Sequence, residues 1–123
     1  MRRLGILISI ISLSILFYQC DRPDILKQEG KLKIENTSTS NYITGVYYST
    51  VGYGSNRIST NIGPGESKTY TLSLEDDGIY DIKVTSDMTD YEEFTYDHYD
   101  FFGFNETYII ELTEEGWYTD SSW

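Results

Sequence analysis

Beyond residue 30 the chain is built of short segments in which apolar and polar residues alternate. In residues 31–35, Leu32 and Ile34 occupy one set of alternate positions, and charged side chains occupy the other. A period of two residues is typical of a β-strand with one face buried. The same pattern, with β-branched and aromatic residues, predicts strands at 31–35, 42–50, 67–74, 79–86, 91–98 and 106–113, with a further short strand at 57–59.

The alternation also predicts which side chains point into the core. The inward residues are expected to be Tyr70, Leu72 and Leu74 in segment 67–74, and Tyr80, Ile82 and Val84 in segment 79–86. Phe94, Tyr96 and His98 are expected to share one face of segment 91–98. In segment 106–113, Tyr108, Ile110 and Leu112 are aligned, with Tyr108 inward. In residues 42–50 the alternation is imperfect, because Ile43 and Val46 are three apart with Gly45 between them. A glycine at such a position indicates a β-bulge.

Turn residues separate the expected strands. Gly63-Pro64-Gly65 marks a turn before residues 67–74, and Asp77-Gly78 is a strong hairpin signal after them. We therefore expect segments 67–74 and 79–86 to pair as an antiparallel hairpin. Residues 99–105 form an aromatic connection, and residues 117–123 close the chain with two tryptophans and a tyrosine.

Residues 31–123 therefore predict an all-β fold, a single small antiparallel β-sandwich of about seven strands. Short strands at regular spacing, with no helical periodicity, are typical of this class. The order of the elements, from the Leu32-x-Ile34-x-Asn36 strand to Gly78-Ile-Tyr-Asp-Ile-Lys-Val84, resembles small immunoglobulin-like or transthyretin-like sandwich modules of exported bacterial proteins. The resemblance implies a fold for residues 31–113 and carries no activity with it.

The first 20 residues, MRRLGILISIISLSILFYQC, read as an export signal. Two arginines precede an apolar run from Leu4 to Phe17, and the segment ends on Cys20, the only cysteine of the chain. This order is typical of a secretory signal peptide. An uncleaved membrane anchor would need about 20 apolar residues, and plain secretion would favour an A-x-A-like cleavage site, so both remain weaker alternatives.

The segment resembles the signal of bacterial lipoproteins, in which the cysteine receives a diacylglycerol and becomes the mature N-terminus. Phe17 replaces the usual leucine, and Tyr18 and Gln19 replace small residues. The looser signals of spirochaete lipoproteins are similar to this one. The resemblance implies acylation of Cys20, a membrane partner and a location in the bacterial cell envelope. Two or three acyl chains would hold the protein firmly, because each buried methylene contributes about 0.8 kcal/mol.

The expected organisation is a signal peptide at 1–19, a lipidated cysteine and tether at 20–30, and the sandwich domain at 31–123. From Cys20 onward the chain has 7 basic and 20 acidic residues, which gives a net charge of −13. This acidity argues against nucleic acid as a partner, since phosphate binding needs a basic surface. With Cys20 acylated, no cysteine remains for a disulfide.

Catalytic chemistry is not expected from this sequence. The single histidine, His98, has no nucleophile elbow to serve, and one histidine cannot form a histidine metal cluster. Calcium is the one cofactor considered, through Asp87, Asp90 and Glu92, because calcium takes carboxylate oxygens from sandwich loops. The plainer interpretation is that these acids serve turn geometry.

Aromatic residues are the remaining candidates for recognition. The chain has 12 tyrosines, and Tyr53 lies in a glycine-rich loop, while Phe101, Phe102 and Phe104 crowd one connection. Exposed aromatic side chains suit protein or glycan contacts. The leading hypothesis is a non-catalytic, membrane-anchored lipoprotein that acts as a structural or protein-interaction module. A glycan or small-ligand binding module that uses these aromatics is the first alternative, and a calcium-stabilised adhesion-type domain is the second.

Overall fold

The computed structural model describes residues 29–74, 78–101 and 106–122, which fold into two β-sheets. The seven strands are β1 (Glu29–Asn36), β2 (Ile43–Ser49), β3 (Ser67–Ser73), β4 (Ile79–Ser86), β5 (Glu93–Asp100), β6 (Thr107–Thr113) and β7 (Gly116–Ser122). No described segment forms a helix, and accordingly no membrane-spanning helix is found among these residues. The expectation of an all-β sandwich of seven strands is confirmed.

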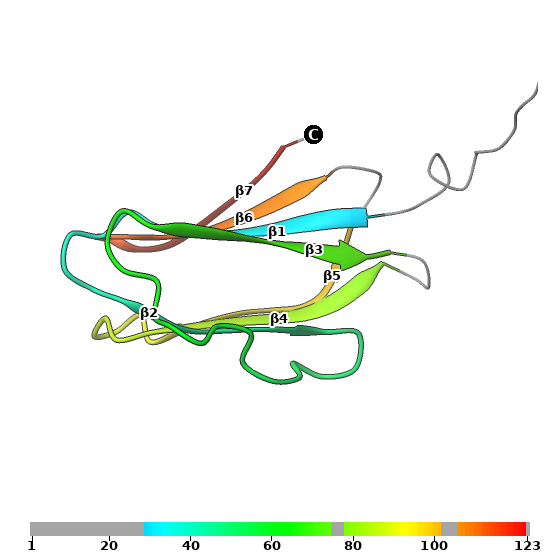
Figure 1. The fold of residues 1–123 in the computed structure, drawn as a ribbon, viewed down its shortest axis with the longest axis horizontal. Helices are drawn as coiled ribbons and strands as arrows, with labels where there is room; N and C mark the ends of the chain where they lie inside the picture. The colour runs from blue at the N-terminus through cyan, green and yellow to red at the C-terminus, as the bar shows by residue number, and fades with distance from the viewer. Residues whose placement is uncertain (1–28, 75–77, 102–105, 123) are drawn as a thin grey trace, which may run out of the picture.

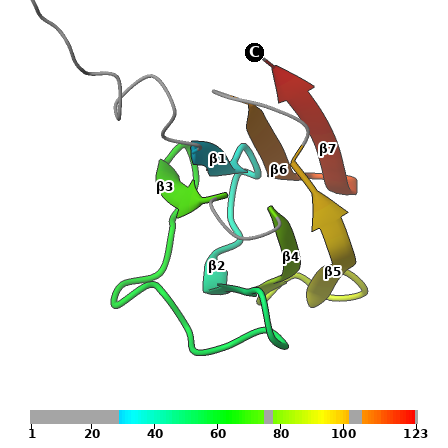
Figure 2. The same cartoon turned by 90° about the vertical axis from the view of Figure 1, so that its right-hand side faces the viewer.

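The sheets form two layers, seen edge-on in Figure 1. One sheet has the strand order β3-β1-β6-β7, and the other has β2-β4-β5. The pairings are antiparallel except for β1 and β6, which run parallel in the middle of the larger sheet. The chain changes sheet after β1, β2, β3 and β5, so only β4–β5 and β6–β7 are hairpins within one sheet. The view in Figure 2 places β5 and β7 at the same side of the molecule.

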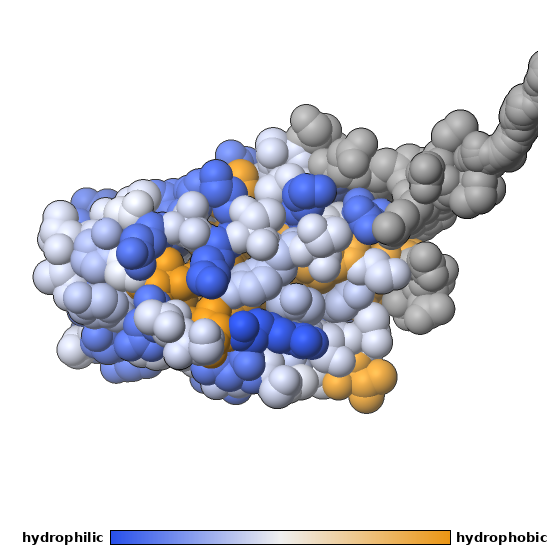
Figure 3. All heavy atoms as spheres, in the orientation of Figure 1, coloured by the Kyte–Doolittle hydropathy of each residue, from blue (hydrophilic) through white to orange (hydrophobic). Residues whose placement is uncertain are grey.

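The core lies between the layers and follows the alternation of the sequence. β1, β4 and β6 each bury every second side chain. The fully buried aliphatic residues are Leu32, Ile34, Ile43, Val46, Ile62, Leu72, Ile82, Val84, Ile110 and Leu112. At about 25 cal/mol per Å² of buried apolar surface, this layer is the main stabilising term of the fold. Figure 3 shows a mostly hydrophilic surface on this side, with apolar colour visible between the sheets.

The expected hairpin between residues 67–74 and 79–86 is wrong. β3 pairs with β1, whereas β4 pairs with β2 and β5 in the opposite sheet. Gly78, just before β4, has a positive φ of 69°. Both strands have one apolar face, and placing them in opposite layers buries those faces against each other. The local turn signal cannot distinguish this arrangement from a hairpin.

Three smaller expectations meet different outcomes. The bulge near Gly45 is confirmed, because the β2–β4 register shifts between Ile43 and Gly45. The short strand expected at 57–59 does not form. The neighbouring residue Asn56 makes only an isolated bridge to Tyr47. The seventh strand is instead β7, which the sequence indicated only as a closing segment. Its hairpin with β6 turns through Glu114 and Glu115, between the paired residues Thr113 and Gly116.

A buried asparagine ties together the loops at the end of the sandwich where β1 ends. Asn36 is 1% exposed, and its Nδ2 donates to the carbonyl oxygens of Asn41 at 2.8 Å and of Ile62 at 2.9 Å. Its Oδ1 accepts from the backbone N–H and the hydroxyl of Ser38. One side chain therefore satisfies groups from two loops that approach from different strands.

Candidate functional site

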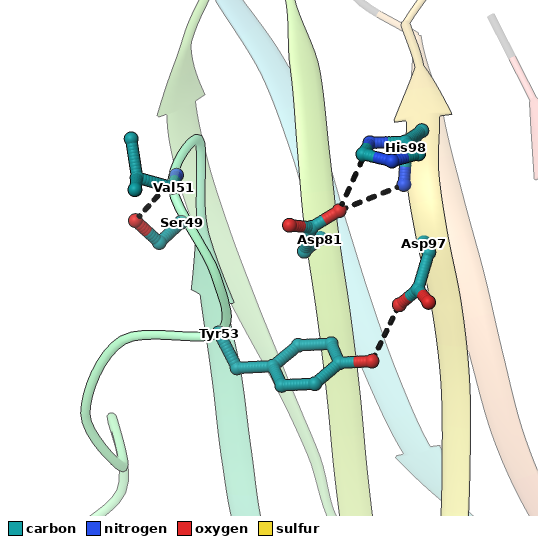
Figure 4. A network of polar contacts seen from close by, with 6 residues as sticks. All are labelled: Ser49, Val51, Tyr53, Asp81, Asp97 and His98. Atoms are coloured by element: carbon teal, nitrogen blue, oxygen red, sulfur yellow. Dashed lines mark hydrogen bonds and ion pairs between the residues drawn. The ribbon is translucent and has the colours of Figure 1, made fainter.

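The loop between β2 and β3 folds back over the outer face of the smaller sheet. Arg57 N donates to the carbonyl of Val46 at 2.7 Å, and the Arg57 guanidinium donates to the carbonyl of Tyr48 at 2.7 Å. Gly52 and Gly54 both have positive φ, 69° and 75°, which a side chain would strain. These two glycines flank Tyr53 and turn the chain so that its ring lies across β4 toward β5 (Figure 4).

The hydroxyl of Tyr53 is held by an acid on the far strand of the sheet. It donates a short hydrogen bond to Oδ1 of Asp97 on β5. This hydrogen bond, then burial and the charges of Asp97 and Asp81, raises the pKa of the Tyr53 hydroxyl. The hydroxyl therefore stays protonated, and remains a hydrogen-bond donor, through neutral and moderately alkaline pH. The Tyr53 side chain is held by the loop backbone at one end and by Asp97 at the other.

A lysine on the central strand lies against two tyrosine rings. Lys83 Nζ is 4.6 Å from the ring centroid of Tyr47 and 5.3 Å from that of Tyr53. Cation–π contacts of this kind contribute about 0.5–1 kcal/mol at exposed sites. Tyr47 and Lys83 are directly paired across β2 and β4, so both point to the outer face.

His98 reaches this face through a bulge. The β4–β5 register shifts between Tyr80 and Ile82, and His98 has φ 62°. Its backbone N–H donates to Oδ1 of Asp81 at 2.9 Å, and its Nδ1 lies 3.3 Å from the same oxygen (Figure 4). The expectation that His98 shares a face with Phe94 and Tyr96 is therefore wrong. The bulge supplies one extra residue, so Tyr99 takes the inward position instead.

These contacts define the Tyr53 face, which comprises Tyr47, Tyr53, Asp81, Lys83, Asp97 and His98. The face combines ring surfaces, a cation, two carboxylates and an imidazole on a flat sheet rather than in a cavity. Such a surface suits a planar or extended partner that is bound by stacking and hydrogen bonds. Sequence reasoning identified Tyr53 but missed Lys83 and Asp97. The signal was available for these two, because Lys83 and Asp97 occupy outward positions of the alternation.

The other aromatic candidates do not join Tyr53. Phe101 is 5% exposed and lies between the sheets, with its ring 4.7 Å from that of Tyr99 and 6.1 Å from that of Tyr80. It is a core residue, and not the exposed aromatic that the sequence suggested. Phe102 and Phe104 lie outside the described residues, as does Cys20.

The acidic residues considered for calcium have local partners. Oδ1 of Asp87 accepts from the Tyr42 N–H at 2.9 Å and from the Asn41 amide at 3.1 Å. A carboxylate oxygen of Glu92 accepts from the Asp90 N–H at 3.2 Å. Within the described ranges, no group of three or more histidine, cysteine or acidic side chains is placed to hold a metal ion.

Two shallow depressions adjoin the start of β3. The larger, of about 460 Å³, is lined by Thr60, Asn61, Ile62, Glu66, Ser67 and Lys68. The smaller, of about 180 Å³, shares Glu66 and Ser67 and extends to Glu35 and Thr37. Oε1 of Glu66 already accepts from the Gly63 N–H at 2.7 Å, which closes the turn before β3.

Comparison with known proteins adds no family. The chain matches no protein-family model, and the search of curated proteins gave no match either. What the chain does must therefore be argued from its own residues.

Proposed function

We propose that the protein is a non-catalytic, lipid-anchored module of the bacterial cell envelope that binds a partner through the exposed side of its smaller sheet. The observation that carries the proposal is the position of Cys20. It is the only cysteine of the chain, it ends the apolar run of the signal segment, and it precedes the first residue of β1, Glu29, by nine positions.

The short spacing limits how far the domain can lie from the bilayer. Eight residues separate Cys20 from Glu29, and a fully extended chain spans at most about 3.3–3.6 Å per residue, so the separation is at most about 30 Å. With acylated Cys20 in the membrane, the end of the sandwich where β1 begins would be the membrane-proximal end. The Tyr53 face runs along the side of the domain and would remain accessible to a partner.

The Tyr53 face supports a recognition role because its side chains are held in place before any partner arrives. Tyr53 is fixed by Asp97, and Lys83 lies against both tyrosine rings. Rigid aromatic groups bind at low entropic cost, because little side-chain freedom is lost on contact.

Anchoring is tested by the intact mass of the protein isolated from the bacterial membrane fraction, beside a Cys20→Ala control. The expected mass is that of residues 20–123 plus acyl chains, with the lipid-bearing species absent from the control. An unmodified full-length mass would instead mean that the first segment is an uncleaved anchor, and the lipoprotein assignment would fall.

A second candidate function is glycan binding, favoured by the ring of Tyr53 lying along the sheet surface. Sugars stack on exposed tyrosine rings and hydrogen-bond to neighbouring carboxylates and amines. A glycan array tests it: a signal that is lost in Tyr53→Ala and kept in the Tyr118→Ala control would support a glycan site. An array without signal would leave the protein-interaction proposal as the only one.

A further inference from the structure

The two sheets end unevenly at the side of the molecule where β5 and β7 lie. β7 is the last strand of the four-stranded sheet, and β5 is the last strand of the three-stranded sheet. The rings of Phe94 and Trp117 meet across the layers at 6.1 Å. Farther along β7, Thr119 and Ser121 are paired with the inward residues Ile110 and Tyr108, yet both are exposed. Beyond Trp117, the core side of β7 is therefore exposed at Thr119 and Ser121.

The outer edge of β5 presents backbone groups in a regular row. Ser86 N donates to the carbonyl of Glu92, which sets the alternation of the β4–β5 ladder. In an antiparallel pair, alternate residues direct their N–H and C=O groups away from the partner strand. For β5 these are Glu93, Thr95 and Asp97, and all three are exposed. Such a row is a template for an added strand.

The interior beside this edge contains aromatic surface and an unsatisfied hydroxyl. Tyr96 is 45% exposed although it lies on the core side of β5, and its ring is 6.0 Å from that of Tyr108. Tyr108 is 4% exposed, and its hydroxyl lies near that of Thr119 on β7 without reaching hydrogen-bond geometry. Burial raises the pKa of Tyr108, and the Thr119 hydroxyl on β7 opposes this only in part.

β5 and the residues after it carry acidic side chains and no lysine or arginine, while Lys83 of β4 is paired with Thr95 across the sheet. No lysine or arginine follows Lys83, whereas eleven acidic residues do. β5 alone carries Glu93, Asp97 and Asp100. A second copy of the chain would bring the same carboxylates against each other, so this edge disfavours pairing with itself. A cationic partner is attracted for the same reason.

We propose that the free edge of β5 accepts an extended, cationic peptide segment of a partner protein as a fourth strand of the smaller sheet. Residues opposite Glu93 and Asp97 would be basic, and the residues opposite Phe94 and Tyr96 would be apolar and pack beneath β7. The sequence recognised is therefore basic–apolar–any–apolar–basic, and the segment pairs antiparallel to β5. The inference rests on the proposed function in naming the partner class, but it does not depend on acylation of Cys20.

The probe is a nine-residue peptide with Lys-Val-Thr-Val-Lys at its centre and two serines on each side. The full chain in a non-ionic detergent is titrated with this peptide at low ionic strength, and binding is followed by amide NMR shifts and hydrogen exchange. We expect saturable binding and slower exchange at Glu93, Thr95 and Asp97. A matching peptide with glutamates in place of both lysines should bind at least tenfold more weakly.

Two methylated peptides separate strand addition from simple charge attraction. N-methylation of the central threonine removes an N–H that would face β5, so binding should be lost. N-methylation of the first valine removes an N–H that faces away, so affinity should change less than threefold. Equal effects of the two methylations, or slower exchange at β3 instead of β5, would overturn the proposal.

Protein variants give the complementary result. Glu93→Lys should weaken binding of the lysine peptide at least tenfold, whereas Glu35→Lys, the same charge change on β1, should leave it within threefold. The amide spectrum of each variant establishes that it is folded. Failure of the lysine peptide to bind the folded chain would refute strand addition but would leave the mass result on Cys20 standing. Conversely, Cys20→Ala should bind the peptide unchanged.

Discussion

The hydroxyl of Tyr99 donates a hydrogen bond of 2.5 Å to the carboxylate of Glu106, which is only 2% exposed. The ring of Tyr99 stacks on that of Tyr108, with centroids 4.0 Å apart. Burial, followed by the hydrogen bond and the charge of Glu106, raises the pKa of Tyr99 well above its usual value of 10. This pair links the end of β5 to the residue that precedes β6.

The Tyr99–Glu106 pair predicts a loss of stability in alkali. Below the unfolded pKa of about 10 the hydroxyl is protonated in both the folded and the unfolded state. Titration of this group therefore does not make the free energy of unfolding depend on pH in that range. Above that pH only the unfolded chain loses the proton, and the free energy of unfolding falls by about 1.4 kcal/mol per pH unit for each such group. Urea unfolding between pH 8 and pH 11 measures the slope. Tyr99→Phe should flatten it, whereas the exposed control Tyr118→Phe should not.

Gly30 is predicted to be intolerant of a side chain. A Cβ at this position would lie 2.6 Å from Cδ2 of Phe101 and 3.1 Å from its Cε2, inside the packed core. Gly30→Ala should therefore cost about 1–3 kcal/mol of unfolding free energy, as overpacking does elsewhere. In a double-mutant cycle, Phe101→Leu should remove part of the penalty. Strictly additive effects of the two substitutions would show that the alanine is accommodated in another way.

Asn36 is predicted to be the most sensitive polar residue of the loops. Asn36→Ala would remove both Nδ2 donors from the carbonyls of Asn41 and Ile62, at a cost of about 2–3 kcal/mol. In thermal unfolding, Asn36→Ala should have a lower midpoint temperature than the unsubstituted protein. Asn61→Ala, at an exposed position in the same region, is the matched control and should change stability by less than about 0.5 kcal/mol. Equal effects of the two substitutions would contradict the assigned role.

The acidic loop after β4 is predicted to be stabilised by its own hydrogen bonds rather than by calcium. Asp87 already accepts from two groups of the loop between β1 and β2, the Asn41 amide and the Tyr42 N–H. The melting temperature should therefore be the same in calcium and in a chelator, and Asp87→Ala should lower it in both. A calcium-dependent rise that disappears in Asp87→Ala would instead establish a metal site in this loop.

The sequence alone was sufficient for six of the seven strands, β1 to β6. The period of two in residues 31–35, 79–86 and 106–113 predicted β1, β4 and β6, and it identified Leu32, Ile82 and Ile110 as core residues. These inferences succeed because successive side chains of a strand point to opposite faces, so a buried face appears in the sequence as an apolar residue at every second position. The same local information placed the bulge at Gly45 and the turns at Gly65 and Asp90.

Only the tertiary structure decided how these elements combine. The Asp77-Gly78 signal specifies a turn but not a partner, so the strands on either side could pair with each other or lie in opposite layers. The extra residue at His98 reverses the faces of the end of β5, which alternation cannot foresee. The Tyr53 face likewise depends on contacts between Tyr53, Lys83 and Asp97, which are far apart in the chain. Local sequence fixes which face of a strand is apolar, whereas strand partners and surface contacts follow from packing the whole chain at once.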